Sequence, residues 1–420
     1  MDHQPHREGN GRGKYSGQSR GEDSASDLRT IVWPERHLDG KPRHKSQLNI
    51  HAFLDATGCS LSYDKFSRRY YVTRSGVTAE LDDIQLRRLR FEADAAGLSP
   101  SEEYFRSALL TVADENSFHP VLKYIKGLSW DGAERLDSFL STYAGAQETD
   151  LAQAFGRKTL LAAVRRVRQP GCKFDACLTL EGPQGCGKSS LIRALAGDAW
   201  FTDCVPVGAD PKTVLEQTAG VWIAELAELA GIRKNDAEHV KTMLSRQSDR
   251  ARLAYGKLTS DVPRQFIFIG SVNPGEFLRD ESGNRRFWPV RVGTINVPLL
   301  LRDRDQIWAE AAHFEAQDES LELPRELWVA AAEEQAERSA IDPWEPTLVR
   351  MFGNRLGFIA TDELWNALCI DTSRQDGAAG RRVTAIMRQV GFRRVRPTIA
   401  GERQYGFTNE PEPPSSSRKA

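Results

Sequence analysis

The chain has 420 residues, a length that predicts two or three domains rather than one. Its 57 basic side chains are balanced by 58 acidic ones, so no global field indicates nucleic acid, and any such partner must bind at local patches. The six cysteines show no metal-ligand spacing and exclude a disulfide framework, while a polar N-terminus and the lack of a long apolar run predict a cytoplasmic protein without membrane contact.

The N-terminal part carries few chemical signals. Residues 1–47 are rich in Gly, Arg, Ser, Asp and His and are expected to form a disordered tail, because they cannot bury enough apolar surface to offset the entropy of ordering. The following "RRYYVTRSGVTAEL" predicts two short strands around Ser75-Gly76. Helices are expected over 81–97 and 101–115, the second capped by Ser101. We expect a small accessory domain here.

The segment 151–174 combines helical spacing of Leu and Val with six basic residues and no acid. Two interpretations stay open. Such a run is usually a solvated helix face, but beside a nucleotide-binding domain it can also follow a nucleic-acid backbone. The six residues are Arg157, Lys158, Arg165, Arg166, Arg168 and Lys173.

The next block, 176–292, alternates apolar strands with helices, which predicts a parallel α/β core. Within it "GPQGCGKS" fits the pattern G-x-x-x-x-G-K-[ST] and lies between a predicted strand and a predicted helix. Backbone N–H groups and the helix N-terminus would hold phosphates, Lys188 would reach the β- and γ-phosphates, and Ser189 would ligate Mg²⁺. The residues expected to bind ATP are Gly182, Pro183, Gln184, Gly185, Cys186, Gly187, Lys188, Ser189 and Ser190.

Hydrolysis of ATP requires an acid on a neighbouring strand and a group that senses the γ-phosphate. A buried strand over 221–224 precedes Glu225, the candidate for the Mg²⁺-associated acid, and Glu228 is the candidate for polarising the attacking water. Because two acids usually stand side by side, either glutamate is alternatively a helix-surface acid. A third apolar strand delivers Asn273, which is a γ-phosphate sensor or else part of an Asn-Pro turn.

Arg285 and Arg286 follow a predicted turn and precede an aromatic strand. Paired arginines often lie on the surface without a role. Phosphoryl transfer, however, gains strongly from an added guanidinium, so the pair is also a candidate for a finger supplied across a subunit boundary.

The stretches "SFHPVLKYIKGLSWDGAERLDSFL", "GVWIAELAEL", "SRQSDRARLAYG" and "GNRRFWPV" resemble the virulence-associated protein E family of phage and genomic-island proteins. The resemblance covers 116–292 and is expected to continue to about residue 344. It implies a core similar to superfamily-three helicases, with an AAA-like ATPase that works as a homo-oligomeric ring, expected to be a hexamer around single-stranded DNA. In that family pattern Glu225 or Glu228 carries the second motif, Asn273 the sensor, and one of the two arginines the finger.

The same resemblance places a DNA-contacting loop within "VKTMLSRQSDRARLAYGKLTSD". The alternative is a solvated helix and hairpin. The candidates for phosphate contacts are Lys241, Arg246, Arg250, Arg252 and Lys257. Larger relatives carry a primase-like domain, but too few residues precede the match here, and they lack a cluster of metal-binding acids, so a built-in primase is not expected.

The last part predicts a small domain. "ATDELWNALCI" predicts a helix capped by Thr361, "RRVTAIMRQVG" has one apolar face, and a hairpin is expected around Ala400-Gly401. Helices followed by a hairpin suggest a winged helix. Between residues 347 and 400 nine arginines outweigh four acids, which favours DNA binding, with protein docking as the alternative.

Together these features predict an ATP hydrolase with a P-loop, AAA-like parallel-sheet core, acting as a DNA helicase-like ATPase in replication of a phage or mobile element, with ATP and Mg²⁺ as cofactors. Two alternatives remain: an AAA-like ATPase that loads or regulates replication proteins without unwinding, and a nucleotide-gated interaction protein that interferes with competing phage. The expected divisions are tails at 1–47 and 409–420, an accessory domain at 48–115, an ATPase domain at 116–344 (helical lead-in 116–174, P-loop core 175–292, helical part 293–344) and a winged-helix-like domain at 347–408.

Overall fold

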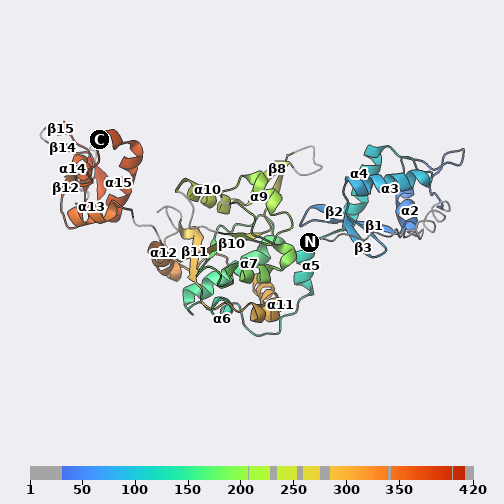
Figure 1. Ribbon diagram of the computed structural model, residues 1–420, viewed down its shortest axis with the longest axis horizontal. Helices are drawn as coiled ribbons and strands as arrows, with labels where there is room; N and C mark the ends of the chain where they lie inside the picture. Colours follow the sequence, from blue (N-terminus) through green and yellow to red (C-terminus); the bar gives the residue numbers. More distant parts are fainter. Residues whose placement is uncertain are drawn as a thin grey trace, which may run out of the picture. The chain divides into compact units, whose positions relative to one another are not determined.

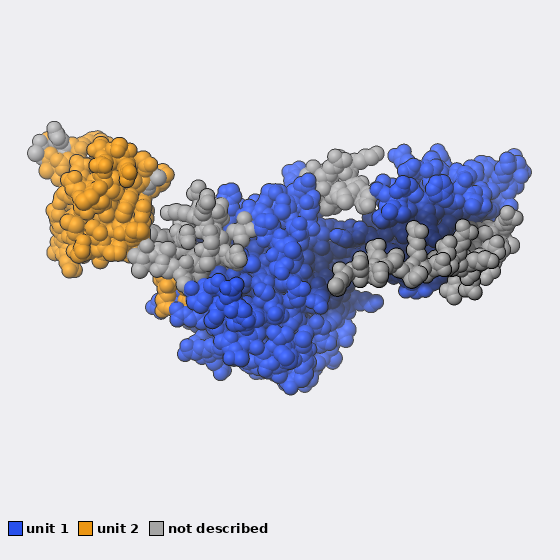
Figure 2. Space-filling view, in the orientation of Figure 1, with its two compact units in different colours: residues 1–274, 283–335 blue, residues 275–282, 336–420 orange. Residues whose placement is uncertain are grey.

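The structure is a computed structural model, and it divides into two compact units, residues 1–274 with 283–335 and residues 275–282 with 336–420 (Figure 2). Within its described part no helix is long and apolar enough to cross a membrane. The described residues are 31–206, 208–227, 234–252, 259–274, 284–338, 342–399 and 401–411.

Residues 31–118 form a four-stranded sheet with the order β3-β2-β1-β4, accompanied by three helices. The predicted hairpin is confirmed: Ser75 and Gly76 both have positive φ (50° and 78°), as a two-residue turn between twisted strands requires. Trp33 is buried in this core, so packing begins before residue 48, within the predicted tail. The elements are α2 (Gln47–Ala56), β1 (Cys59–Asp64), β2 (Arg69–Arg74), β3 (Val77–Glu80), α3 (Asp83–Ala95), α4 (Glu102–Glu115) and β4 (Ser117–Phe118).

Ser101 precedes α4 as predicted, but its side chain makes no capping hydrogen bond. The acidic first turn of α4, Glu102 and Glu103, supplies the negative charge that favours a helix start. The cap prediction is therefore right in position and wrong in mechanism.

A five-stranded parallel sheet with the order β11-β5-β10-β7-β6 forms the centre of the first unit (Figure 1). This confirms the predicted α/β class with a parallel sheet. The inner strands are buried along their whole length and mostly apolar, because both faces of such a sheet are covered. The strands are β5 (Cys177–Glu181), β6 (Phe201–Thr202), β7 (Ile223–Leu226), β10 (Ile267–Val272) and β11 (Phe287–Arg291).

Helices pack around this sheet, and α11 lies against both α7 and α8. Trp222 and Trp308 are fully buried, with ring centroids 4.1 Å apart, and they join the sheet to α11. The helices are α5 (Pro120–Gly127), α6 (Phe139–Ala144), α7 (Asp150–Arg168), α8 (Lys188–Ala196), α9 (Pro211–Gln217), α10 (Lys234–Ser245), α11 (Val297–Glu315) and α12 (Trp328–Glu337).

The basic helix predicted within 151–174 is α7, and the expectation of a solvated face is wrong. Most of its basic side chains form ion pairs with acids of α11 and of the segment after it, so their charges are neutralised within the molecule. The pairs are Arg157 and Lys158 with Glu319, Arg165 and Arg168 with Glu315, and Arg157 with Asp137. Because these guanidinium groups already have carboxylate partners, the alternative of a nucleic-acid track along α7 is also disfavoured.

Arg166 differs from its neighbours on α7. It is buried, donates from Nη2 to the carbonyl oxygen of Phe174 at 2.7 Å, and has a pKa lowered to about 10 by burial. Lys173, beyond the helix end, is exposed.

An antiparallel hairpin of β8 (Ser248–Arg252) and β9 (Thr259–Pro263) follows α10. A buried ion pair closes its base, because Arg264 donates to both carboxylate oxygens of Asp249 at 2.5 and 2.8 Å. Both side chains are at most 2 % exposed. The hairpin base is thus a fixed structure, while its tip lies outside the described residues.

The second unit contains a three-stranded sheet with the order β12-β16-β13 and three helices around one core. The apolar face predicted on α15 is confirmed, with Val383, Ile386 and Met387 buried. The strands β14 and β15 flank the predicted turn at Gly401. The elements are α13 (Glu345–Phe352), β12 (Phe358–Ala360), α14 (Thr361–Ala367), α15 (Gly377–Gln389), β13 (Arg393–Val395), β14 (Thr398–Ile399), β15 (Glu402–Arg403) and β16 (Gly406–Thr408).

Thr361 is not the cap of α14, contrary to the prediction. Ala360 holds that position, and its backbone N–H donates to Glu363 at 3.3 Å. The Thr361 hydroxyl instead donates to the carbonyl oxygen of Tyr405 and links the helix start to the hairpin.

Candidate functional site

The glycine-rich loop connects β5 to α8, so the predicted strand, loop and helix are all present. Gly187 precedes the helix with φ +100°, a conformation that side chains rarely adopt. At Gly182 an added Cβ would lie 2.8 Å from Val292, so only glycine fits that position. The first N–H groups of α8 have no acceptor within the helix and face the loop, as an anion site requires.

Lys188 lies against the loop. Its Nζ donates to the carbonyl oxygens of Gly182 and Pro183 at 2.6 and 2.9 Å, and the residue is 9 % exposed. The ammonium group therefore lies within the concave side of the loop. This is the position from which a lysine contacts phosphates bound there.

Glu225 lies in strand β7, one residue before the end of the strand, close to the predicted strand-end position. Its Oε1 accepts hydrogen bonds from the hydroxyls of Ser189 at 2.8 Å and Ser271 at 2.6 Å. The loop, β7 and β10 thus meet at one carboxylate.

Ser271 was not predicted. Its signal in the sequence is a single hydroxyl inside the apolar run "FIFIGSV", and it lies two residues beyond Ile269, the register partner of Glu225. Alternate residues of a strand share a face, which explains why its hydroxyl reaches the glutamate.

The oxygen set around Glu225 fits a magnesium ion. Its Oε2 is buried and has no hydrogen-bond partner among the described residues, an arrangement that leaves an anionic lone pair for a cation. Mg²⁺ prefers one or two carboxylate or hydroxyl ligands together with phosphate oxygens and waters, not a full protein cage. Consistently, no group of three or more His, Cys, Asp or Glu side chains suited to a metal occurs in the described part of the chain.

Asn273 lies at the same edge of the sheet. It directly follows β10, the strand between β5 and β7, and its side chain is exposed. The preceding Val272 accepts from the backbone N–H of Gly182 at 3.1 Å, so Asn273 is adjacent to the loop. Glu228 lies outside the described residues.

The arginine pair is not brought together with the loop. Parallel pairing sets Phe287 opposite Cys177 and Arg291 opposite Glu181, so β11 begins where β5 begins. The loop follows the end of β5, which places the pair about 15 Å away along the strands. Arg285 and Arg286 therefore belong to the opposite edge of the sheet, beside a cleft of about 900 Å³ whose walls include Trp288 and Trp328.

The predicted DNA-contacting residues have different environments. Lys241 is buried and lies 3.7 Å from Glu238, which argues against a direct phosphate contact. Arg246 is partly buried, 4.0 Å from Asp249. Arg250 is 73 % exposed on the hairpin, with Asp261 at 3.8 Å. Arg252 ends β8, and Lys257 lies outside the described residues.

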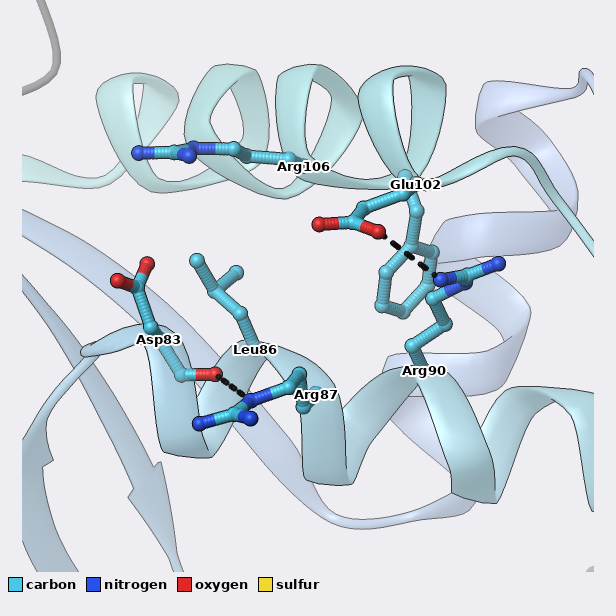
Figure 3. Close-up of a pocket in the computed structure, with 7 residues that line it drawn as sticks. Asp83, Leu86, Arg87, Arg90, Glu102 and Arg106 are labelled. Atoms are coloured by element: carbon cyan, nitrogen blue, oxygen red, sulfur yellow. Dashed lines mark hydrogen bonds and ion pairs between the residues drawn. The ribbon is translucent and has the colours of Figure 1, made fainter.

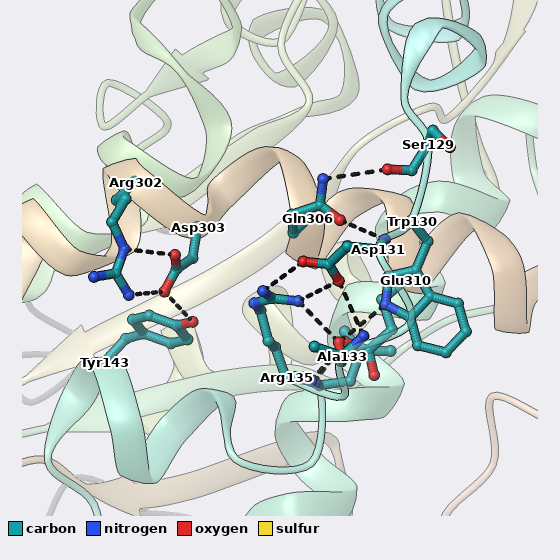
Figure 4. A network of polar contacts seen from close by, with 11 residues as sticks. Ser129, Trp130, Asp131, Ala133, Arg135, Tyr143, Arg302, Asp303, Gln306 and Glu310 are labelled. Carbon is teal, nitrogen blue, oxygen red and sulfur yellow. Dashed lines mark hydrogen bonds and ion pairs between the residues drawn. The ribbon is translucent and has the colours of Figure 1, made fainter.

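A polar network holds the segment before α6 against α11 (Figure 4). Gln306 bonds Ser129 and Asp131 of this segment, at 3.2 and 2.8 Å. Glu310 accepts from the backbone N–H groups of Arg135 and Leu136, at 2.6 and 3.2 Å, and burial raises its pKa.

This network fixes one wall of the loop site. Tyr143 of α6 donates to Asp303 of α11 at 3.0 Å, and the carbonyl oxygens of Tyr143 and Ala144 accept from Asn296 and Gly293. Ile295, in the segment so held, lies against Gly187. The position of the loop's outer wall is therefore set by contacts made far from it in the sequence.

A separate cavity of about 410 Å³ lies between α3 and α4 (Figure 3). Within its lining Arg90 forms an ion pair with Glu102 at 3.2 Å, and Arg87 donates to the backbone carbonyl oxygen of Asp83. This cavity holds none of the predicted site residues.

Fold and site together define an α/β protein whose parallel sheet carries, at its carboxyl edge, a glycine-rich loop, a lysine and a buried acid. A family model described as the virulence-associated protein E-like domain matches residues 125–340, and the chain belongs to this family. The resemblance stated from the sequence motifs is thereby confirmed. No curated protein matches the chain.

Solved structures of the NrS-1 C-terminal region are similar to this chain. The structure described as "The A form apo structure of NrS-1 C terminal region-CTR(305-718)" has a TM-score of 0.50 at 12% identity and covers 87% of this chain and 99% of that chain. Two others, "The A form apo structure of NrS-1 C terminal region-CTR" and "The apo structure of NrS-1 C terminal region (305-718)", have TM-scores of 0.46 and 0.45, also at 12% identity, and each covers 84% of this chain and 97% of that chain. At this identity the likeness concerns the fold alone.

Proposed function

We propose that the chain is an ATP hydrolase with a P-loop, AAA-like core of the superfamily-three helicase type, which assembles into a ring and translocates DNA in the replication of a phage or other mobile element. One observation carries the proposal. At the carboxyl edge of the sheet the hydroxyls of Ser189 and Ser271 both donate to Glu225, and Lys188 lies beside them against the loop. Ligands of open α/β sheets bind at that edge. A cytoplasmic site of action belongs to the same proposal.

The proposed roles follow from the contacts. The loop and Lys188 bind the β- and γ-phosphates, and Ser189 with Glu225 would hold Mg²⁺, which supplies charge neutralisation at the phosphates. Ser271 fixes the Glu225 carboxylate through one oxygen, and the other oxygen, which has no hydrogen-bond partner among the described residues, would be available to hold the ion. Asn273 contacts the γ-phosphate as its sensor, and Glu228, outside the described residues, keeps the proposed role of polarising the attacking water.

The position of Arg285 and Arg286 supports the proposal that the chains assemble into a ring. A guanidinium at the amino edge of the sheet does not serve the loop of its own chain, so its place is beside the nucleotide of a neighbouring subunit. A hexamer is the form of ring proposed.

The second unit supports DNA as the partner. Its three helices, its hairpin and its small sheet are the elements on which the proposal of a winged helix rests. Arg381 and Arg388 lie seven residues apart on α15, hence on one face, and both are exposed. Neither makes an ion pair among the described residues, so both are free to bind phosphate.

The test compares the wild-type chain with Lys188→Ala in ATP turnover, with and without single-stranded DNA, and in strand separation on a forked duplex. We expect DNA to raise the wild-type turnover and Lys188→Ala to abolish it, because the loop loses its mobile cation. The matched control is Lys126→Ala, an exposed lysine in the last turn of α5 that belongs neither to the loop nor to the cleft beside the arginine pair.

Each result selects one function. Turnover with strand separation supports the helicase. Turnover without separation favours a loader or regulator of replication proteins, and the absence of turnover leaves a nucleotide-gated interaction protein. Turnover that DNA does not raise contradicts translocation.

A further inference from the structure

The arginine pair lies just before β11, in a short 3-10 helix, Asn284–Arg286. With three residues per turn, successive side chains in such a helix diverge by about 120°. The two guanidinium groups therefore point in different directions, and they have different surroundings. Arg285 is exposed and makes no hydrogen bond or ion pair in the described part of the chain. Arg286 is half-buried and bound within its own subunit.

Arg286 has two partners. Its Nε donates to the hydroxyl oxygen of Ser245 at 2.9 Å and lies 3.4 Å from the carboxylate of Asp175. The Ser245 hydroxyl in turn donates to the carbonyl oxygen of Lys241 at 2.7 Å. Because its hydrogen is used in that bond, a lone pair of the Ser245 oxygen is directed to Arg286, and the contact is oriented rather than incidental.

Ser245 is the last residue of α10 and stands three residues before β8. The chain between them is held tightly. Arg264, at the end of the hairpin, donates to the carbonyl oxygen of Met243 at 2.5 Å and to that of Gln247 at 2.9 Å, besides its pair with Asp249. The end of α10 and the base of the hairpin are thus one fixed body, and Arg286 binds directly to it.

We propose that Arg285 is the finger that reaches the neighbouring subunit's nucleotide and that Arg286 is a positioning residue, which couples that finger to the base of the β8–β9 hairpin through Ser245. The inference rests on the proposed function and names a regulation of the same site. A displacement of Arg285 toward a bound nucleotide moves the 3-10 helix, and the bond between Arg286 and Ser245 carries that movement to the hairpin. In the opposite direction, DNA bound at the hairpin positions the finger.

The experiment separates the finger from the coupling contact. Ser245→Ala removes the acceptor and leaves both arginines in place, whereas Ser245→Thr keeps a hydroxyl there. We expect Ser245→Ala to retain DNA-independent turnover and the KM for ATP within about twofold, because Ser245 ends α10 and makes no contact with the glycine-rich loop among the described residues. Stimulation by single-stranded DNA should fall several-fold, and Ser245→Thr should restore it.

Arg285→Ala should behave differently. Loss of a finger lowers turnover by about a thousandfold or more, with or without DNA. Mixing Arg285→Ala with Lys188→Ala should recover activity, because one chain then supplies the loop and the other the guanidinium. Arg286→Ala should retain far more basal turnover than Arg285→Ala.

Two results overturn the inference. One is unchanged DNA stimulation in Ser245→Ala, and the other is loss of basal turnover, with recovery by mixing, in Arg286→Ala but not in Arg285→Ala. The wild-type chain tests the proposed function separately: if DNA does not stimulate its turnover, translocation fails and the coupling fails with it. If DNA stimulates the wild-type chain normally and either of the two overturning results is found, the inference fails while the proposed function stands.

Discussion

Helices α7 and α15 are both rich in arginine, yet the structure uses their charges in opposite ways. On α7 the guanidinium groups point into the molecule, where Glu315 and Glu319 pair with them. On α15, Arg381 and Arg388 are exposed and without ion pairs among the described residues. A basic helix therefore has a structural or a binding role according to where its acids lie, not according to its own composition.

The difference arises far from either helix. Glu315 and Glu319 lie some 150 residues after the arginines that they bind, at the end of α11 and just beyond it. The fold brings them to α7, and the burial of Glu315, at 4 % exposure, makes its two ion pairs costly to break. Among the described residues no acid pairs with the exposed arginines of α15, while Arg382 on the same helix is bound to Asp342.

The largest expected effect comes from removing the acid on the α7 side. Glu315→Ala removes the buried carboxylate shared by Arg165 and Arg168 and leaves Arg165 only the exposed Asp318, and breaking a buried pair in this way costs about 3–5 kcal/mol in the free energy of unfolding. Urea denaturation measures it. The control is Asp318→Asn, at an acid 3.4 Å from Arg165 but 90 % exposed; asparagine also tolerates the positive φ of this position, so the loss of charge should cost no more than about 1 kcal/mol. Equal losses in the two variants would mean that the α7 pairs are surface pairs.

A smaller effect, and one of a different kind, is expected on α15. The double variant Arg381→Ala with Arg388→Ala should leave the free energy of unfolding within about 0.5 kcal/mol of the wild type. The slope of log DNA affinity against log salt concentration should become shallower, by the amount that corresponds to the loss of about two phosphate contacts.

Arg382→Ala is the matched control on the same helix. Its guanidinium pairs with Asp342 and lies 3.8 Å from the ring centre of Trp344, so its loss should lower stability without changing the salt slope. A salt slope that falls for Arg382→Ala but not for the double variant would reverse the assignment of α15.

The features that could be predicted from the sequence are those that depend on neighbouring residues. The strand, loop and helix around Lys188 and the turn at Ser75-Gly76 depend on adjacent residues, and both were predicted correctly. The alternation of apolar strands and helices likewise gave the parallel α/β class.

What the sequence missed depends on contacts between distant segments. The burial of α7 requires acids from another helix, and the second hydroxyl on Glu225 comes from Ser271, 46 residues later. Lys241 is a candidate for DNA contact because it lies in the stretch where the family resemblance places a DNA-contacting loop, but it is buried. Charge and spacing name candidate residues, while tertiary packing decides which of them reach solvent.

The smallest expected effect is a pH dependence on the α7 side. Burial raises the pKa of Glu319, but hydrogen bonds from Arg157 and Lys158 outweigh it and leave this pKa below its ordinary value. Because the folded state favours the carboxylate, the stabilisation is complete above the unfolded pKa of about 4.3 and is lost as the pH falls through the lower, folded pKa.

Glu319→Gln should therefore lower the free energy of unfolding at pH 7 by roughly 1 kcal/mol, since charge-assisted bonds are replaced by neutral ones. The difference from the wild type should shrink as the pH is lowered toward 3, in denaturation curves recorded at each pH. Glu322→Gln, at an exposed acid in the same segment, should show neither effect. A constant difference across this pH range would show that Glu319 stabilises α7 by packing alone. The contrast between the two helices would then rest on burial rather than on charge.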